Sequence, residues 1–266
     1  MTTTLAGEPL LAHWIGPLGG MVPVAFGTPV SESSPDRYSI RTSLSGRAWA
    51  YDTLSGNVAT AARTWEAAFP LLDPDDAAVL YDLANGVQSG TVAFVPDTAV
   101  RMNVLTPSGF AGAGASSSRA GTMLGADGRT HPSERGGYSG VAPAVPELPV
   151  SAAADVSGPS TLSLSLQDAS GRTLASTSVE HTEVGTVRLD VSLPATLGAA
   201  RAVLNVSGDG VQSARHQVAW TGTIPEAYAP PGAASSVIVA AHTLQPRGVY
   251  QGRTIYSGTL TIQEVG

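Results

Sequence analysis

The fold is indicated most clearly by residues 61–107, which read AARTWEAAFPLLDPDDAAVLYDLANGVQSGTVAFVPDTAVRMNVLTP. The first part of this stretch alternates at a period of two, with Arg63, Trp65, Ala67 and Phe69 on one side. Such alternation is typical of a β-strand with one buried face. Residues 91–95 form a second short apolar segment, which ends at Pro96 and predicts another strand.

The residues between these two segments predict a helix over 73–85. Asp73 is suited to the N-cap and Pro74 to the first helical position, and the acids of this first turn face the positive end of the helix. Gly86 supplies a C-terminal stop. The inward stripe is predicted to consist of Leu80, Leu83 and Ala84. No residue of this stretch is suited to catalysis, so its role is predicted to be structural.

The order of these elements also resembles that of a known protein family. A Trp-containing strand, an Asp-Pro helix start, a Phe-containing strand and a closing Asn103-Val104-Leu105-Thr106-Pro107 resemble the N-terminal half of minor tail proteins of long-tailed (siphovirus-type) phages of high-GC Gram-positive hosts. Among these, the distal tail proteins are the most similar group. The resemblance implies a structural virion protein of the tail tip, made in the host cytoplasm, that forms a hexameric ring. Its implied partners are further copies of itself, the tail tube protein, the tail hub or baseplate and the tape measure protein.

The sequence predicts a mainly β protein with two domains. Residues 1–107 are expected to form a tail-ring domain, a sheet or split barrel with one helix, which includes a hairpin between Tyr38 and Tyr51. Residues 108–119, rich in Gly, Ala and Ser, are expected to be a flexible linker. Residues 120–266 contain several short alternating segments separated by turn residues, which predicts an antiparallel β-sandwich of jelly-roll type.

The C-terminal part carries a second resemblance. The order of its strands and its ending, Ile262-Gln263-Glu264-Val265-Gly266, resemble the galectin-like or carbohydrate-binding-module-like sandwiches at the C-termini of phage tail proteins. This resemblance implies an alternative function, a glycan-binding module that contacts the host cell wall during adsorption.

Composition limits the remaining function classes. Only 13% of the 266 residues are charged, which favours association with neighbouring proteins. The net charge of −7 argues against nucleic-acid binding, and the absence of cysteine excludes disulfides and thiolate metal sites. The chain lacks an apolar run long enough for a membrane span, and Met1-Thr2-Thr3-Thr4 lacks the basic start of a signal peptide. We therefore expect no membrane or nucleic-acid partner, which agrees with the virion protein that the resemblance implies.

The titratable residues do not predict an active site. Asp73, Asp75 and Asp76 are explained by the helix start, and Asp168 by a turn, although a calcium ion at Asp168 is left open. No acidic pair of the kind that glycoside hydrolysis needs is apparent. The histidines appear isolated along the sequence, and they are His13, His131, His181, His216 and His242. The sequence thus predicts a protein that is not an enzyme and has no metal or cofactor.

Two aromatic residues are the candidate glycan contacts, because a flat ring can cover one face of a sugar. Tyr228, between Pro225 and Pro230, is the better candidate for an exposed ring, whereas Trp220 is favoured as a core residue. A sugar site usually has more than one exposed ring, and no cluster of acids and amides is expected near Tyr228. The sequence therefore favours an architectural role for the sandwich over sugar binding.

Overall fold

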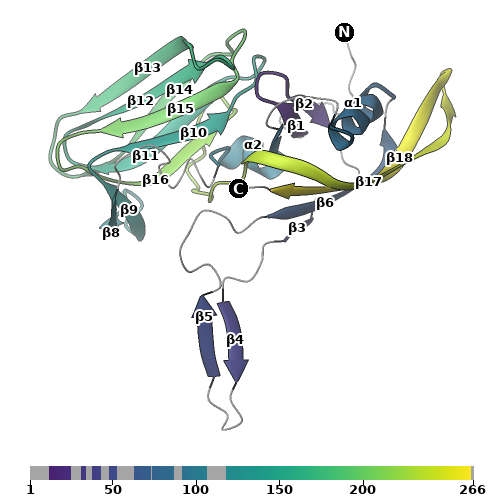
Figure 1. The fold of residues 1–266 in the computed structure, drawn as a ribbon. Coiled ribbons are helices and arrows are strands. Elements are labelled where there is room, and N and C mark those ends of the chain that lie inside the picture. Colours follow the sequence, from purple (N-terminus) through teal and green to yellow (C-terminus); the bar gives the residue numbers. More distant parts are fainter. Residues whose placement is uncertain are drawn as a thin grey trace. The chain divides into compact units, whose positions relative to one another are not determined.

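The computed structural model describes residues 12–24, 31–33, 38–42, 48–52, 63–72, 74–86, 92–106 and 118–264. These residues form a mainly β protein, as predicted, with two helices (Figure 1). They divide into two compact units. The sandwich unit comprises the described parts of residues 1–24 and 90–235, and the hairpin unit comprises those of 25–89 and 236–266. Neither helix is long and apolar enough to cross a membrane.

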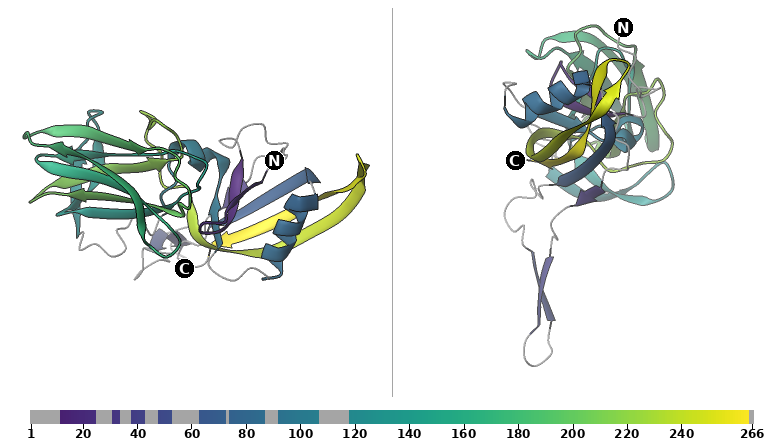
Figure 2. Two further views of the ribbon diagram at one scale, coloured as in Figure 1. Left: turned by 90° about the horizontal axis from the view of Figure 1, so that it is seen from above. Right: turned by 90° about the vertical axis from the view of Figure 1, so that its right-hand side faces the viewer.

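The sandwich unit contains the predicted antiparallel β-sandwich, which Figure 2 shows in two further views. One sheet has the order β10-β15-β12-β13 and the other the order β14-β11-β16-β9-β8. The strands of the first are β10 (Tyr138–Pro143), β15 (Arg201–Ser207), β12 (Ser160–Gln167) and β13 (Thr173–His181). Those of the second are β14 (Thr186–Leu193), β11 (Val150–Ser157), β16 (Gln212–Ala219), β9 (Thr130–Arg135) and β8 (Ser118–Leu124).

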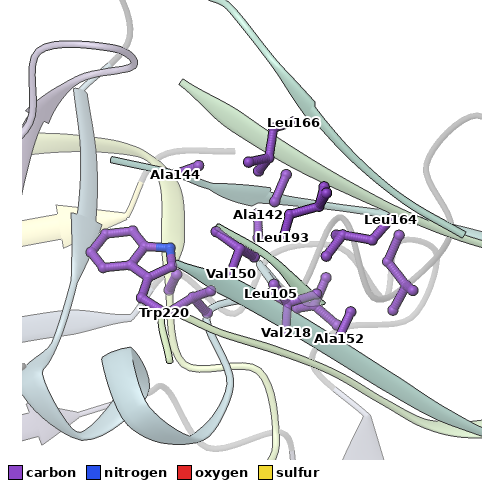
Figure 3. Packing of buried hydrophobic residues seen from close by; sticks show 14 of the residues in the cluster. Leu105, Ala142, Ala144, Val150, Ala152, Leu164, Leu166, Leu193, Val218 and Trp220 are labelled. Atoms are coloured by element: carbon purple, nitrogen blue, oxygen red, sulfur yellow. The ribbon is translucent and has the colours of Figure 1, made fainter. Parts of the chain in front are cut away.

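The core of the sandwich follows the alternation of its strands. In β12 the leucines Leu162, Leu164 and Leu166 are fully buried, while the serines between them are half-buried. Side chains from both sheets meet there (Figure 3). Trp220 lies at one end of this cluster, where its indole N–H donates a 2.9 Å hydrogen bond to the carbonyl of Pro143. Its ring packs edge-on against Trp14.

The Asn-x-Leu-Thr segment connects three parts of the sandwich unit. Asn103, fully buried, follows α2 (Asp97–Met102), a helix that the sequence analysis did not predict. Its amide nitrogen donates to the carbonyls of His216 and Ala229, at 3.2 and 2.9 Å. Its amide oxygen accepts from the N–H groups of Leu105 and Val218, both at 3.2 Å. The side chain of Asn103 therefore satisfies buried backbone groups that an apolar residue would leave unpaired.

Strands β1 (His13–Pro17), β2 (Val22–Val24) and β7 (Val92–Val95) also belong to the sandwich unit. β1 pairs with β2 and with β7, so the predicted strand 91–95 is confirmed. The Nδ1 atom of His13 accepts a 3.1 Å hydrogen bond from the N–H of Asp97 at the start of α2. Burial lowers the pKa of His13, although the charge of Asp97 acts in the opposite direction. The side chain of His13 thus holds the first turn of this helix.

The hairpin unit is built on strands far apart in the sequence, in the order β17-β18-β6-β3. These strands are β17 (Ala234–Tyr250), β18 (Arg253–Glu264), β6 (Thr64–Leu72) and β3 (Ser31–Ser33). The predicted strand at 63–69 and the predicted hairpin are both present, the latter as β4 (Tyr38–Thr42) paired with β5 (Ala48–Asp52). The last strand of the chain, β18, pairs with β6 and β17 pairs with β18, although the sequence assigned these final strands to the sandwich. The expected boundary at residue 107 differs accordingly, and residues 108–117 of the expected linker lie outside the described residues.

The predicted helix is α1 (Pro74–Ala84). Leu80 and Leu83 are buried as expected, whereas Ala84 is half-buried. The helix ends at Ala84, and the predicted stop residue Gly86 follows it with a φ of 66°, in the left-handed region that favours glycine. The N-cap candidate Asp73 lies outside the described residues.

An ion pair closes the hairpin unit between the start of β6 and the end of β18. Arg63 donates from Nε and Nη2 to the two carboxylate oxygens of Glu264, at 3.0 and 3.1 Å. The N–H of Glu264 also donates to the carbonyl of Arg63 at 2.8 Å. The guanidinium lies over the ring of Trp65, 4.9 Å from its centroid. Charged bidentate pairs of this kind fix geometry as well as adding stability.

We expect Glu264→Gln to lower the free energy of unfolding by about 1–3 kcal/mol, because a largely buried guanidinium loses its charged acceptor. Glu66→Gln is the matched control, since Glu66 is an exposed acid on β6. Urea unfolding of the full chain measures both values. An equal effect of the two substitutions would contradict a structural role for the Arg63–Glu264 pair.

Candidate functional site

The outer face of the five-stranded sheet carries a fully buried carboxylate, that of Asp155 on β11. Arg188, directly opposite on β14, donates from Nη1 to Asp155 Oδ1 at 3.1 Å. Arg215 on β16 donates from Nη1 to Oδ2 at 3.2 Å. The N–H of Ala126 donates to the same oxygen at 2.9 Å. Three neighbouring strands and a turn therefore converge on one acid.

A β-bulge places Arg215 on this face. Ala153 pairs with Gln217 but Asp155 pairs with Ala214, so Arg215 and His216 together lie opposite Ala154. Arg215 has a φ of 51°, in a region that residues other than glycine rarely adopt. The bulge directs Arg215 outward to Asp155 and His216 into the core, where its ring stacks on Tyr138. Bulges of this kind often redirect a side chain beside a functional site.

Gln217 and a second hydrogen bond of Arg215 attach the loop after β16 to this network. Gln217 accepts a 2.6 Å hydrogen bond from Arg188 Nη2 and donates to the carbonyls of Met102 and Ala227, at 2.8 and 3.1 Å. Arg215 Nη2 donates to the carbonyl of Glu226 at 3.2 Å. The loop is thereby held over the sheet by buried side chains.

The turn between β8 and β9 closes the network on its other side. Asp127 Oδ2 lies 3.4 Å from Arg215 Nη1, and His131 Nε2 lies 3.0 Å from Asp127. A Cβ atom on Gly125 would lie 2.7 Å from Asp155 Oδ2, so only glycine allows this close approach. Partial desolvation opposes ionisation of Asp127. The N–H of Arg129, His131 and the charge of Arg215 nevertheless hold the pKa of Asp127 below its usual value.

A solvent-open cavity of about 420 Å³ lies over these groups. This volume falls within the range of about 300–1,000 Å³ that is typical of small-molecule sites. Its wall combines two guanidinium groups, three carboxylates and several hydroxyl groups with the aliphatic side chain of Ile224. The lining residues are Ala126, Asp127, Ser151, Arg188, Asp190, Val191, Ser192, Arg215, Gly222, Thr223, Ile224 and Glu226. We call this the β14–β16 cavity.

The two sequence-predicted glycan contacts lie in different environments. Trp220 is fully buried and offers no ring face to a ligand. Tyr228 is half-buried and packs against His131, with ring centroids 6.4 Å apart. Burial raises the pKa of Tyr228, while the charges of Arg215 and Arg188 act in the opposite direction. The phenol of Tyr228 therefore lies near both guanidinium groups, which themselves bind Asp155 and Gln217.

The other candidates remain structural. Asp168 accepts from Ser170 and Arg172 within its turn, and these interactions lower its pKa. Asp75 is exposed and lies 3.4 Å from Arg253. His131 is not isolated, because the turn brings it to Asp127, four residues earlier. Across the described part of the chain, no group of three or more histidines or acids is arranged to hold a metal ion.

Sequence reasoning missed the residues that form the network, namely Asp155, Arg188, Arg215 and Gln217. A signal was present in β11, where Asp155 is the one charged residue in a strand of small and apolar residues. The network cannot be read from the alternation of β16, because the bulge changes which of its residues share a face.

Comparisons with known proteins identify no family. Neither a family model nor a curated protein matches the sequence. Among solved structures, the chain is similar to an arabinose-bound α-L-arabinofuranosidase, with 13% identity and a TM-score of 0.29 over 39% of this chain and 22% of that one. It is also similar to the enzymatically active domain of tailspike protein 4 of bacteriophage CBA120, with 9% identity and a TM-score of 0.28 over 71% of this chain and 19% of that one. The matched parts span about a fifth of each neighbour.

Proposed function

We propose that this chain is a structural, non-enzymatic protein of a phage tail tip, whose copies associate through the hairpin unit into a ring between tail tube and baseplate. The observation that carries the proposal is a set of large apolar side chains that this unit exposes on α1, near the start of β17 and at its end. Its residues are Tyr81 (55% exposed), Ile238 (48%), Val249 (71%) and Tyr250 (66%). We call these four residues the hairpin surface.

The geometry of the hairpin unit explains why Val249 and Tyr250 are uncovered. Strand β17 has 17 residues and extends about 55 Å, whereas α1 has 11 residues and is about 16 Å long. The far end of the β17–β18 hairpin therefore extends past the helix (Figure 1). Its tip turns at Gln251 and Gly252, with φ angles of 49° and 80°, which suits a tight two-residue hairpin turn.

A second copy of the chain is the occupant that fits this surface best. The hairpin surface is apolar, and only 13% of the residues in the whole chain are charged, a composition that favours association. A cavity of about 330 Å³ beside α1 could receive apolar side chains of a neighbouring copy. It is lined by Pro74, Ala77, Ala78, Tyr81, Asp82, Leu244 and Tyr256. The tail tube, hub or baseplate and tape measure proteins are further partners under this proposal.

We expect the full chain to form rings, visible by electron microscopy, and an oligomer in sedimentation velocity. Val249→Glu combined with Tyr250→Glu should convert the oligomer to monomer, because each new charge would be buried in the interface. The matched control is Val184→Glu combined with Leu197→Glu, at sites 94% and 92% exposed on the sandwich unit, which should leave the oligomer intact. A native chain that stays monomeric at high concentration would contradict the proposal, and so would equal effects of the two variants.

A further inference from the structure

We infer that the β14–β16 cavity is a binding site for a neutral sugar, an activity separate from the proposed assembly through the hairpin unit. The cavity has the volume of a small-molecule site, and its polar groups lie on regular strands or on a loop that buried side chains attach. Its position on the sandwich unit leaves it independent of whether copies associate through the hairpin surface.

The lining suits hydroxyl groups, each of which donates one hydrogen bond and accepts others. Acceptors for a sugar hydroxyl are the exposed carboxylates of Asp190 and Glu226. Donors are the guanidinium groups of Arg188 and Arg215, which lie in the same wall. The hydroxyl groups of Ser192 and Thr223, both exposed, can either donate or accept a hydrogen bond. Ile224 supplies an apolar contact for the C–H groups of a pyranose ring.

The charges of the wall favour a neutral ligand over an ionic one. Both arginines are already compensated by Asp155, which lies behind the wall, and Arg215 also lies close to Asp127. Three carboxylates and two guanidinium groups line the cavity, so a phosphate, sulfate or uronate would encounter more negative than positive charge. A protonated amine would in turn be repelled by the two arginines, because it carries the same charge. A polyhydroxy compound uses both kinds of group without introducing a charge.

The base of the cavity is rigid and strained in the manner of a functional site. The side chain of Arg215 is only 5% exposed, and its backbone lies in the left-handed region. Its Nε atom is buried and has no hydrogen-bond partner among the described residues. Backbone strain and unsatisfied buried donors are rare in structures and concentrate where a site demands a particular geometry. The packing of the core alone does not require an arginine here, because Arg215 points away from it.

The test uses the full chain on an array of neutral, acidic and amino oligosaccharides, followed by calorimetric titration with the best neutral sugar, its uronic acid and its amino sugar. We expect saturable binding of a neutral sugar, with binding of its uronic acid about tenfold weaker or more. Ser192→Trp should fill the cavity and weaken binding at least about tenfold. Asp190→Asn, which replaces one oxygen acceptor by a donor, should weaken it about threefold to tenfold.

The matched control is Thr186→Trp. Thr186 is exposed on the same face of β14, six residues from Ser192 and about 20 Å away, and does not line the cavity. Its variant should bind the sugar as the native chain does, and thermal melts confirm that both tryptophan variants fold. The inference is overturned if no neutral sugar binds saturably, if the charged forms bind as tightly, or if Ser192→Trp binds normally. Loss of binding in the control would place the sugar elsewhere and overturn it equally.

Discussion

Asp155→Asn is expected to lower the free energy of unfolding of the sandwich unit by about 3–5 kcal/mol, because it leaves buried charges without their partner. The carboxylate of Asp155 is fully buried and receives hydrogen bonds from Arg188, Arg215 and the N–H of Ala126. An asparagine of the same shape keeps one acceptor oxygen but presents an NH₂ group to a guanidinium donor. The two arginines, with side chains 18% and 5% exposed, cannot easily regain water.

Urea unfolding of the full chain measures this loss, with Asp190→Asn as the matched control. Asp190 is an exposed acid on neighbouring β14, and its substitution should change stability by less than about 0.5 kcal/mol. The double variant Asp155→Asn with Arg188→Gln should lose less stability than the sum of the two single losses. The reason is that each single variant leaves one buried charge unpaired, whereas the double variant removes both charges of the pair. Additive losses, or a single loss as small as that of the control, would show that the network does not stabilise the fold.

The elements predicted from the sequence were those whose signals are local. The alternation around Trp65 predicted β6, and the leucines of β12 predicted a sandwich strand, because one buried face imposes a period of two. Gly86 ended the predicted helix because its left-handed φ is an intrinsic preference of glycine. The turn around Asp168 was predicted for the same kind of reason, since its hydrogen bonds lie within a few residues.

The division into units could not be predicted in this way, because it depends on pairing between distant segments. β18 pairs with β6, with Leu260 beside Ala67 and Ile262 beside Trp65. The alternation of the final strands showed that they have a buried face but not which sheet they join. Helix α2 was missed because six residues between a proline and a strand-like Asn-Val-Leu carry little periodicity.

The candidate site was hidden for a related reason. Tyr228 was identified from its exposed setting, but its value as a contact was discounted because no acids or amides adjoin it in the sequence. The structure brings Arg188 and Arg215 near it from two strands, and Arg188 in turn binds Asp155 and Gln217. A bulge in β16 supplies Arg215, and a bulge cannot be read from alternation alone. The same fold placed Trp220 in the core, which the sequence favoured.

Acidification is also expected to destabilise the sandwich unit strongly. We expect His216 to cause most of this loss of stability. Burial lowers the pKa of His216 from 6.5 to about 3. Its ring stacks on Tyr138 at 3.5 Å, and its Nε2 atom lies 2.9 Å from the hydroxyl of Ser213. The folded state therefore keeps the ring neutral at a pH where the unfolded chain takes up a proton. Its contribution to stability is complete above pH 6.5 and decreases by about 1.4 kcal/mol per pH unit down to about pH 3.

The variant His216→Phe tests this expectation, because it keeps a flat ring against Tyr138 but cannot be protonated. Urea unfolding between pH 7 and 4.5 should show a steeper loss of stability for the native chain than for the variant. His13, whose pKa is also lowered by burial, should leave a smaller slope of the same sign in the variant. The acids with lowered pKa values, Asp127 and Asp168, lose their contributions only at lower pH, as they become protonated. Equal slopes for the two chains would mean that the ring of His216 reaches water before the unit unfolds.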